Sequence, residues 1–162
     1  MRIINDADAV EFVDGDGAKL FLHPAPRQRD LIASNKLAHD EAIEELDKLK
    51  ANGIDTDAIM QAAAAKPDLL AAAEKAVRTS LPSPKVRRLR FGALAVRIKD
   101  GETVIEGHQK LMEAYDNMDF ASAAWADATV HEVWNAAIPS DADTRGEGAD
   151  VALSEEPVGS AD

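Results

Sequence analysis

The sequence predicts an α+β fold that is mainly helical, and three observations support that prediction. Apolar residues alternate with polar ones around an Asp-Gly turn near the start of the chain, and branched residues surround a second Asp-Gly step in its middle. Elsewhere apolar residues recur every three or four positions, which is the period of a helix face. The last segment is acidic and poor in large apolar residues. We therefore expect one globular domain over residues 1–138 and a tail over residues 139–162.

The first expected element is an N-terminal β-hairpin. The turn sequence Asp14-Gly15-Asp16-Gly17 supplies residues that accept the positive φ angles of a hairpin turn. Side chains at alternate positions on either side of it point to one face of a strand pair. These apolar residues are Val10, Phe12, Leu20 and Leu22. Pro24 and Pro26 end the second strand, because proline cannot donate a hydrogen bond to a strand ladder.

A long helix is expected next, over about residues 27–51. It ends at Asn52-Gly53, since glycine commonly follows the last turn of a helix. Residues three and four positions apart define its expected inner face, which contains one polar member. This face consists of Leu31, Asn35, Ala38, Ala42, Leu46 and Leu49.

Two shorter helices are expected to follow. Asp55 or Thr56 can cap the first of them by accepting free amides of its first turn. Pro67 fits the first turn of the next helix, where its missing N–H is not needed. The stretch Leu81-Pro82-Ser83-Pro84 is the expected linker after it, because two prolines prevent the helix from continuing.

The middle of the chain predicts a second strand pair. Val86–Ile98 is rich in branched residues, Asp100-Gly101 provides a turn, and Thr103–Ile105 returns. Gly92 weakens the first of these strands, so a helix over Val86–Val96 remains an open alternative.

Two helices and the tail complete the prediction. The first covers residues 108–117, and Asp119 is positioned to cap the second. The apolar face of this last helix consists of Ala123, Ala126, Val130, Val133, Trp134 and Ala137. After Pro139 the chain carries seven acidic residues against Arg145 alone, a net charge of −6. Such a segment buries too little apolar surface to offset its ordering entropy, so we expect it to be disordered.

Composition restricts the possible functions. The formal net charge of −12 argues against a general nucleic-acid binder and against an anionic membrane surface, since both attract cations. The chain has no cysteine, which excludes disulfides and thiolate chemistry and fits a reducing compartment. We see no signal peptide and no run near the roughly 20 apolar residues that span a bilayer. The expected location is the cytoplasm.

No catalytic, cofactor or metal site is predicted. The Asp14–Gly17 turn lacks the oxygen ligands that an EF-hand calcium loop has at its fifth and twelfth positions, where Ala18 and Ala25 stand here. The histidines are scattered, without the spacing of a zinc site. They are His23, His39, His108 and His131. No nucleophile elbow or glycine-rich phosphate loop occurs. We therefore expect a protein that is not an enzyme.

One basic segment stands out between residues 85 and 99. It contains six cations with no acid between them: Lys85, Arg87, Arg88, Arg90, Arg97 and Lys99. Three interpretations remain open. The segment contacts nucleic acid, for which only Phe91 offers a stacking aromatic; it binds an acidic partner or the chain's own acidic tail; or it is a solvated strand edge, where cations deter edge-to-edge pairing.

The two tryptophans are the aromatic candidates for a partner contact. Trp125 and Trp134 lie nine residues apart on the last predicted helix, so they point in different directions. We expect one, Trp134, in the core and the other, Trp125, partly exposed, where tryptophan often anchors an interface. The candidate partner-binding residues are thus Trp125, Trp134, Arg87, Arg88 and Arg90.

The order of these elements resembles that of bacteriophage tail assembly chaperones. The resemblance is carried by MRIINDADAVEF at residues 1–12, KLFL at 19–22, the Asp-Gly turn at Ile98–Gly101, and VHEVWN at 130–135. It spans most of residues 1–138 in layout and contains no diagnostic signature. The alanine-rich section Ala62–Ala76 has no counterpart in that pattern.

The resemblance implies a non-enzymatic role in the cytoplasm of a bacterial host. Such chaperones bind the tape measure protein and recruit tail tube subunits, then leave the finished particle. A homo-oligomer is compatible with this role. One alternative is a virion protein, such as a head–tail connector or minor tail protein, which would remain in mature particles. Another is a nucleic-acid-associated regulator that uses the basic segment 85–99 and would bind DNA at low salt.

Overall fold

The computed structural model describes residues 1–138 as a mainly helical α+β fold, and this confirms the predicted class. The acidic tail predicted for residues 139–162 lies outside the described residues. A short 3-10 turn at Asp6–Asp8 precedes the first strand. The remaining elements are β1 (Val10–Val13), β2 (Lys19–Leu22), α1 (Gln28–Ala51), α2 (Thr56–Ala64), α3 (Pro67–Thr79), α4 (Pro84–Leu94), β3 (Ala95–Asp100), β4 (Thr103–Glu106), α5 (His108–Asp116) and α6 (Phe120–Ala137).

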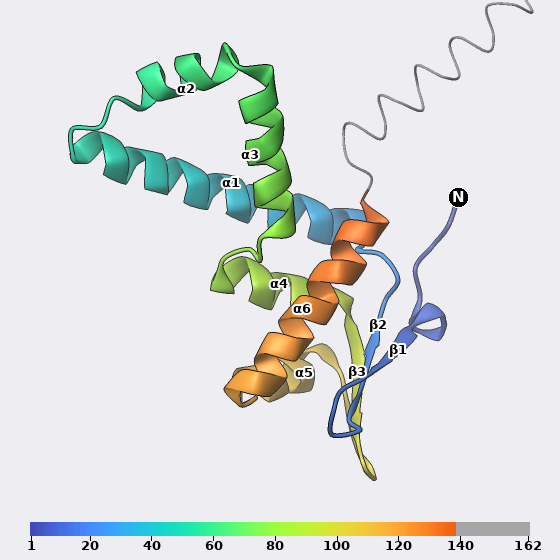
Figure 1. Cartoon of the computed structure of the whole chain (residues 1–162). Coiled ribbons are helices and arrows are strands. Elements are labelled where there is room, and N and C mark those ends of the chain that lie inside the picture. The colour runs from blue at the N-terminus through green and yellow to red at the C-terminus, as the bar shows by residue number, and fades with distance from the viewer. Residues whose placement is uncertain (139–162) are drawn as a thin grey trace, which may run out of the picture.

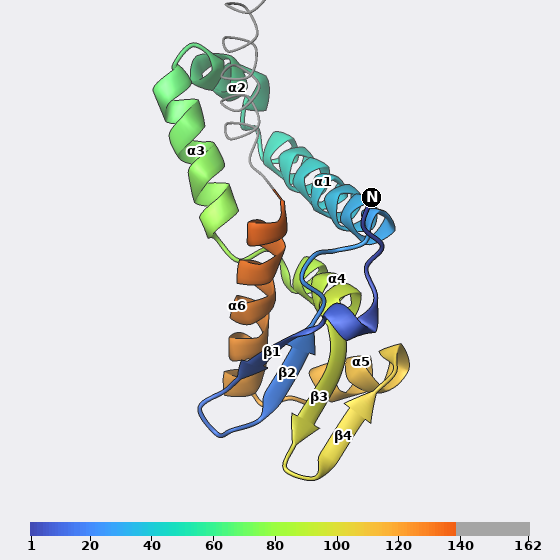
Figure 2. The ribbon, with the colours of Figure 1, turned by 90° about the vertical axis from the view of Figure 1, so that its right-hand side faces the viewer.

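The four strands form one antiparallel sheet in the order β1-β2-β3-β4. The predicted N-terminal hairpin is confirmed, and the second strand pair is added to it through β2 and β3. Cross-strand partners place four apolar side chains in one row, and this row packs against the core. The row consists of Phe12, Leu20, Ile98 and Ile105. Helices α5 and α6 lie on that face of the sheet (Figure 2).

The core lies where the sheet meets α4, α5 and α6. Leu22, Phe91 and Leu94 are fully buried, and Trp134 of α6 is 2% exposed. The caps predicted for the helices are present, since Asp55 accepts from the Ala58 amide at 3.0 Å and Asp119 from the Ser122 amide at 2.7 Å. These contacts satisfy amides that the first turn of a helix leaves free.

The strand predicted from Val86 is wrong as far as Leu94, and the helical alternative is correct there. Ser83 caps α4, with its Oγ accepting from the Val86 amide at 3.3 Å, and Pro84 occupies the first turn. Gly92 belongs to this helix. A Cβ at that position would lie 2.8 Å from Met112 Sδ, so glycine allows α4 to approach α5 closely. Only Val86 in this stretch is β-branched, whereas its arginine, leucine and alanine residues favour a helix, so local propensity and packing agree.

The predicted inner face of α1 is also partly wrong. Ser34 is its only fully buried residue, and Leu31 and Leu37 are half-buried, whereas Asn35 and Ala38 are exposed. Only the first half of α1 packs on α4, and Arg90 Nε donates to Ser34 Oγ at 3.0 Å in that contact. We call residues 1–41 and 82–138 the body. The face of α1 that meets the rest of the body is therefore rotated relative to the apolar pattern.

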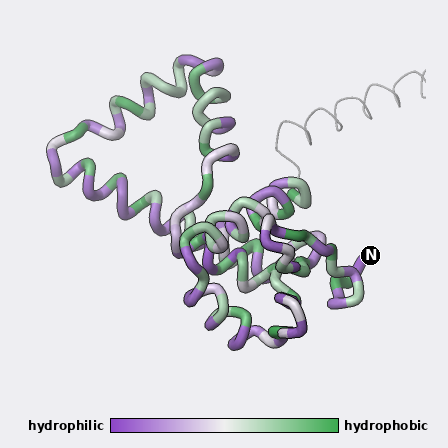
Figure 3. The backbone as a smooth tube through the Cα atoms, turned by 60° about the horizontal axis from the view of Figure 1, so that its bottom comes forward, coloured by the Kyte–Doolittle hydropathy of each residue, from purple (hydrophilic) through white to green (hydrophobic). Residues whose placement is uncertain are grey.

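The second half of α1 leaves the body together with α2 and α3. These helices form three sides of an open triangle (Figure 1), which we call the arm and define as residues 42–81. One hydrogen bond joins the two residues that flank the arm at its base, and another joins the arm to α6. Ser83 Oγ donates to Glu41 Oε2 at 2.6 Å, and Asn135 Nδ2 donates to the Arg78 carbonyl at 3.1 Å. Figure 3 shows hydrophobic stretches along the arm, away from the body.

Candidate partner-binding site

The arm carries the largest share of exposed hydrophobic side chains. Of the 15 large hydrophobic residues that are exposed in the described chain, eight lie in this segment of 40 residues. They are Ile43, Ile54, Ile59, Met60, Leu69, Leu70, Val77 and Leu81. None of the ten buried hydrophobic residues of the core lies there. The arm therefore has an apolar surface without an apolar interior.

Helix α3 shows how the sequence produces this surface. Pro67 begins the helix and alanines extend it, so local propensity alone favours the helical state. Leu69 and Val77 lie on one face of the helix with Ala73 between them, and they are 56% and 78% exposed. Large exposed apolar patches on monomeric proteins often mark interaction sites, so this stripe is a candidate contact surface.

The predicted burial of the two tryptophans agrees with where they lie. Trp134 is buried, and the Arg90 guanidinium lies 4.7 Å from the centre of its ring. Trp125 is half-buried and lines a cleft of about 380 Å³ between the sheet and the α5–α6 corner, together with Met118 and Ile105. Only Trp125 is therefore available to a partner without rearrangement of the core.

Each of the three candidate arginines has an intramolecular partner. Arg88 forms a two-bond contact with Asp116 of α5, with both nitrogen–oxygen distances at 2.8 Å. This pair lowers the pKa of Asp116 and raises that of Arg88. Arg90 is half-buried between Ser34 and Trp134, and burial lowers its pKa. Arg87 Nη1 donates to the Pro82 carbonyl at 3.2 Å.

The rest of the basic segment does not form a strand edge. Arg97 and Lys99 belong to β3, which is a central strand, whereas β1 and β4 are the edges. Arg97 lies over the Phe21 ring at 4.4 Å and pairs with Glu106 at 3.4 Å. Lys85 is exposed at the start of α4. The segment is thus divided between a helix and a strand, and four of its arginines take part in contacts within the chain.

A buried polar network is the feature that sequence reasoning missed. Tyr115 Oη donates to Asp127 Oδ1 at 2.7 Å, and Arg87 Nε lies 3.1 Å from Asp127 Oδ2. The second contact is an ion pair whose angle does not make a hydrogen bond. Burial raises the pKa of Tyr115 to about 12, with the Asp127 contact adding to the shift. The network links α4, α5 and α6, and an Asp on the expected apolar face of α6 was its only signal.

The histidines provide no metal site in the part of the chain that the structure describes. No group of three or more metal-ligating side chains comes together among residues 1–138. His23 is buried beside Asp6, with Nε2 at 3.3 Å from its carboxylate, and burial lowers the pKa of His23. Burial likewise lowers the pKa of His131, whose Nε2 lies 3.0 Å from Asn135 Nδ2.

Comparison with known proteins adds no relative. No family model, curated protein or solved structure matches the chain. No helix among the described residues is long and apolar enough to cross a bilayer.

Proposed function

We propose that the chain is a non-enzymatic assembly chaperone of a phage or prophage tail. In this role the arm covers apolar helical stretches of the tape measure protein and keeps that protein in solution. Tail tube subunits are then recruited around the tape measure protein. The single observation that supports this most is the concentration of eight exposed large hydrophobic residues in the arm. The resemblance in element order supplies the identity of the partner.

The shape of the arm supports a helical partner. Its three helices frame an open triangle, and each of them contributes exposed apolar side chains (Figure 1). An amphipathic helix that packs on such side chains buries its own apolar residues at three- and four-residue spacing. The same contact is reversible, because no covalent or metal bond is needed to make it.

Charge supports a role in keeping a partner dispersed. The chain carries a net charge of −12. A complex that includes it remains far from neutral at physiological pH, and like charges on separate complexes oppose their association. A long apolar-striped helix bound by several such chains would be protected from self-association.

The test is co-expression with a candidate tape measure protein, followed by capture through a tag on that protein. The informative variant replaces Leu69, Leu70 and Val77 with glutamine, which is polar but retains helix propensity. Each large apolar side chain contributes about 1.5–3 kcal/mol when fully buried. Loss of three such contacts is expected to weaken binding by at least about 100-fold.

The matched control is Phe120→Gln. Phe120 is 90% exposed but lies on α6, outside the arm. This variant should bind as the unchanged chain does. Equal capture of the triple variant and the unchanged chain would refute the role of the arm. Presence of the chain in purified mature particles would instead identify a virion component.

A further inference from the structure

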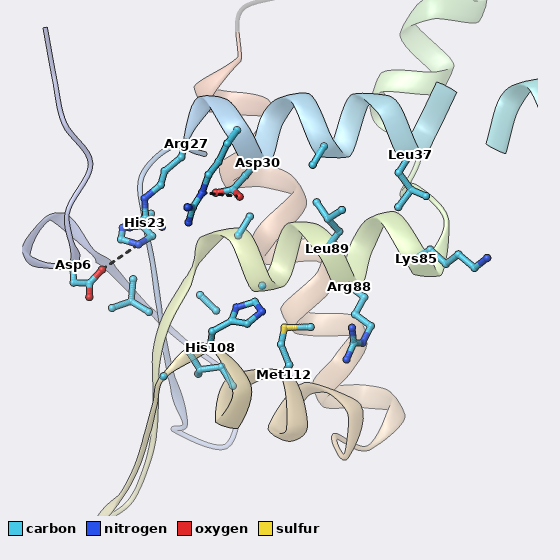
Figure 4. Close-up of a pocket in the computed structure, with 18 residues that line it drawn as sticks. Asp6, His23, Arg27, Asp30, Leu37, Lys85, Arg88, Leu89, His108 and Met112 are labelled. Carbon is cyan, nitrogen blue, oxygen red and sulfur yellow. Dashed lines mark ion pairs between the residues drawn. The ribbon is translucent and has the colours of Figure 1, made fainter. Parts of the chain in front are cut away.

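A groove of about 780 Å³ lies between α1, α4 and α5, on the side of α1 that faces α5 (Figure 4). Leu37 of α1, Leu89 of α4 and Met112 of α5 form its apolar floor. This groove is separate from the arm and from the Trp125 cleft. Its volume falls in the range of ligand and peptide sites, which are commonly about 300–1,000 Å³.

Cations stand at both ends of the groove. Arg27 lies at one end beside His23, and Lys85 at the other, with Arg88 between them on the opposite rim (Figure 4). Of the four arginine and lysine residues in its lining, Arg29 pairs with Asp30, and Arg88 pairs with Asp116 of α5. Among the described residues, no carboxylate pairs with Arg27 or Lys85 within 4.0 Å. The groove is therefore a cationic site on a strongly acidic protein.

The starts of two helices favour a negative group at the Arg27 end. Helices α1 and α5 both begin at this groove, and neither has a side-chain cap on its first turn. Free amides at a helix N-terminus attract anions, so a carboxylate of an occupant would accept from them. His23, whose side chain is only 4% exposed, lines the same end and leaves its Nδ1 without a hydrogen-bond partner. Because Nε2 of His23 faces Asp6, this Nδ1 is an acceptor, and a donor group of an occupant would satisfy it.

We propose that residues 150–156 of this chain dock in the groove. Their sequence, Asp-Val-Ala-Leu-Ser-Glu-Glu, has an acidic residue at the start, two at the end and apolar residues between them. The groove has the complementary order, with cations at each end and an apolar floor. The apolar residues of the segment thus match the apolar floor, and its acidic residues match the cations.

The dimensions fit this occupant. The groove follows α1 from Arg27 to Leu37, which is about 15 Å at the rise of an α-helix. Six residue steps in an extended chain cover up to about 20 Å. Ile138, the last described residue, lies against Leu31 and Asn35 on another face of α1. The eleven residues between it and Asp150 reach up to about 36 Å, which exceeds the roughly 10 Å width of a helix.

Tethering favours the chain's own segment over a foreign acidic peptide. A segment joined to the body by a short connection has an effective concentration in the millimolar range. A separate acidic protein is repelled at long range by the net charge of −12 and has no such advantage. This inference does not depend on the proposed chaperone function, because it concerns a different surface.

The absence of cysteine allows a clean test on the full chain. Ser154→Cys provides a single thiol for a nitroxide label, and amide signals are recorded with the label oxidised and then reduced. We expect loss of intensity at amides that line the groove, such as those of Leu89 and Ala93. Amides on the outer sheet face, such as that of Phe21, should keep their intensity.

The charge dependence provides the control. In the labelled chain, replacing Asp150, Glu155 and Glu156 with their amides should restore the groove signals, as should higher salt. Lys85→Gln should restore them in part, whereas Lys66→Gln on the arm should not. Equal loss of amide intensity in the groove and on the outer sheet face would overturn the proposal. It would also be overturned if the groove signals stayed weak after Asp150, Glu155 and Glu156 were replaced with their amides. Loss seen only between labelled and unlabelled copies would also overturn it, since the occupant would then be a second chain.

Discussion

Asp127 offers the sharpest test of how the body is held together. Its carboxylate is 8% exposed on α6, accepts a hydrogen bond from Tyr115 of α5 and pairs with Arg87 of α4. The perturbation is Asp127→Ala, which leaves two polar groups without their shared partner. Removing one member of a buried charge pair is strongly destabilising, because the other member stays desolvated.

The expected loss follows from the two contacts. A hydrogen bond to a charged group contributes about 1.5–3 kcal/mol. Loss of one partner from a fully buried pair costs about 3–5 kcal/mol, but the Arg87 side chain is 28% exposed and can recover some hydration. We therefore expect the free energy of unfolding to fall by about 3 kcal/mol. For a domain of this size that corresponds to a Tm about 10 °C lower.

The assay is chemical and thermal unfolding of Asp127→Ala, Tyr115→Phe, the double mutant of these two, Asp127→Asn and one control variant. Tyr115→Phe should cost about 1.5 kcal/mol in the unchanged background and much less in Asp127→Ala, so that the coupling energy is about 1 kcal/mol. Asp127→Asn retains an acceptor for Tyr115 and should cost about half as much as the alanine. Glu132→Ala, an exposed carboxylate on the same helix, serves as the control and should change stability by less than about 0.5 kcal/mol.

Alkaline titration provides an independent readout of the same network. The pKa of Tyr115 is about 12 in the folded chain, above its ordinary value of about 10. The contribution of the neutral phenol to the free energy of unfolding is therefore fully present below pH about 10. It is lost as the pH rises toward 12. Tyr115→Phe should remove this dependence. A cost below about 1 kcal/mol for Asp127→Ala, with additive double-mutant energies, would refute the interpretation of a buried network.

The remaining predictions concern burial, pH and capping, and unfolding measurements check all of them. Phe91→Ala should cost about 3–5 kcal/mol because Phe91 is fully buried, whereas Val77→Ala in the arm should cost less than about 0.5 kcal/mol. His23 and His131 have lowered pKa values, so stability present above pH about 6.5 should fall as the pH drops, and their replacement with asparagine should flatten that dependence. Asp119→Ala should cost about 1 kcal/mol by removing the α6 cap, and Asp119→Ser should restore most of it.

Local signals in the sequence were sufficient for most of the fold. The hairpin, the caps at Asp55 and Asp119, and Pro67 at the start of α3 were all predictable, because each rests on the chemistry of a few neighbouring residues. The helix over Val86–Leu94 was missed, because this stretch was grouped with the branched residues Val96 and Ile98 that follow it in β3. Within the stretch only Val86 is β-branched, and its arginine, leucine and alanine residues favour a helix. Ser83 before Pro84 was the local signal that could have corrected it.

The sequence was sufficient to predict how buried the candidate aromatic residues are, but it could not predict which residues the candidate arginines contact. Trp134 in the core and Trp125 at the surface follow from their spacing on one helix. The partners of Arg87 and Arg88 do not, since Asp127 and Asp116 lie 40 and 28 residues further along the chain. A cluster of cations in the sequence therefore does not establish a free basic surface. The fold must show which charges have already been paired.

The arm and the body draw stability from different sources, and this difference bears on function. The body has ten buried hydrophobic residues, whereas Thr56 is the only buried residue of the arm. Helix α2 has nine residues, fewer than the roughly 12–15 at which an isolated helix becomes even marginal. The arm should therefore open locally at lower free energy than the body. A partner that binds the arm only when its helices are formed stabilises that folded state by mass action. Part of the binding energy is then used to order the arm, which lowers the net affinity and favours release.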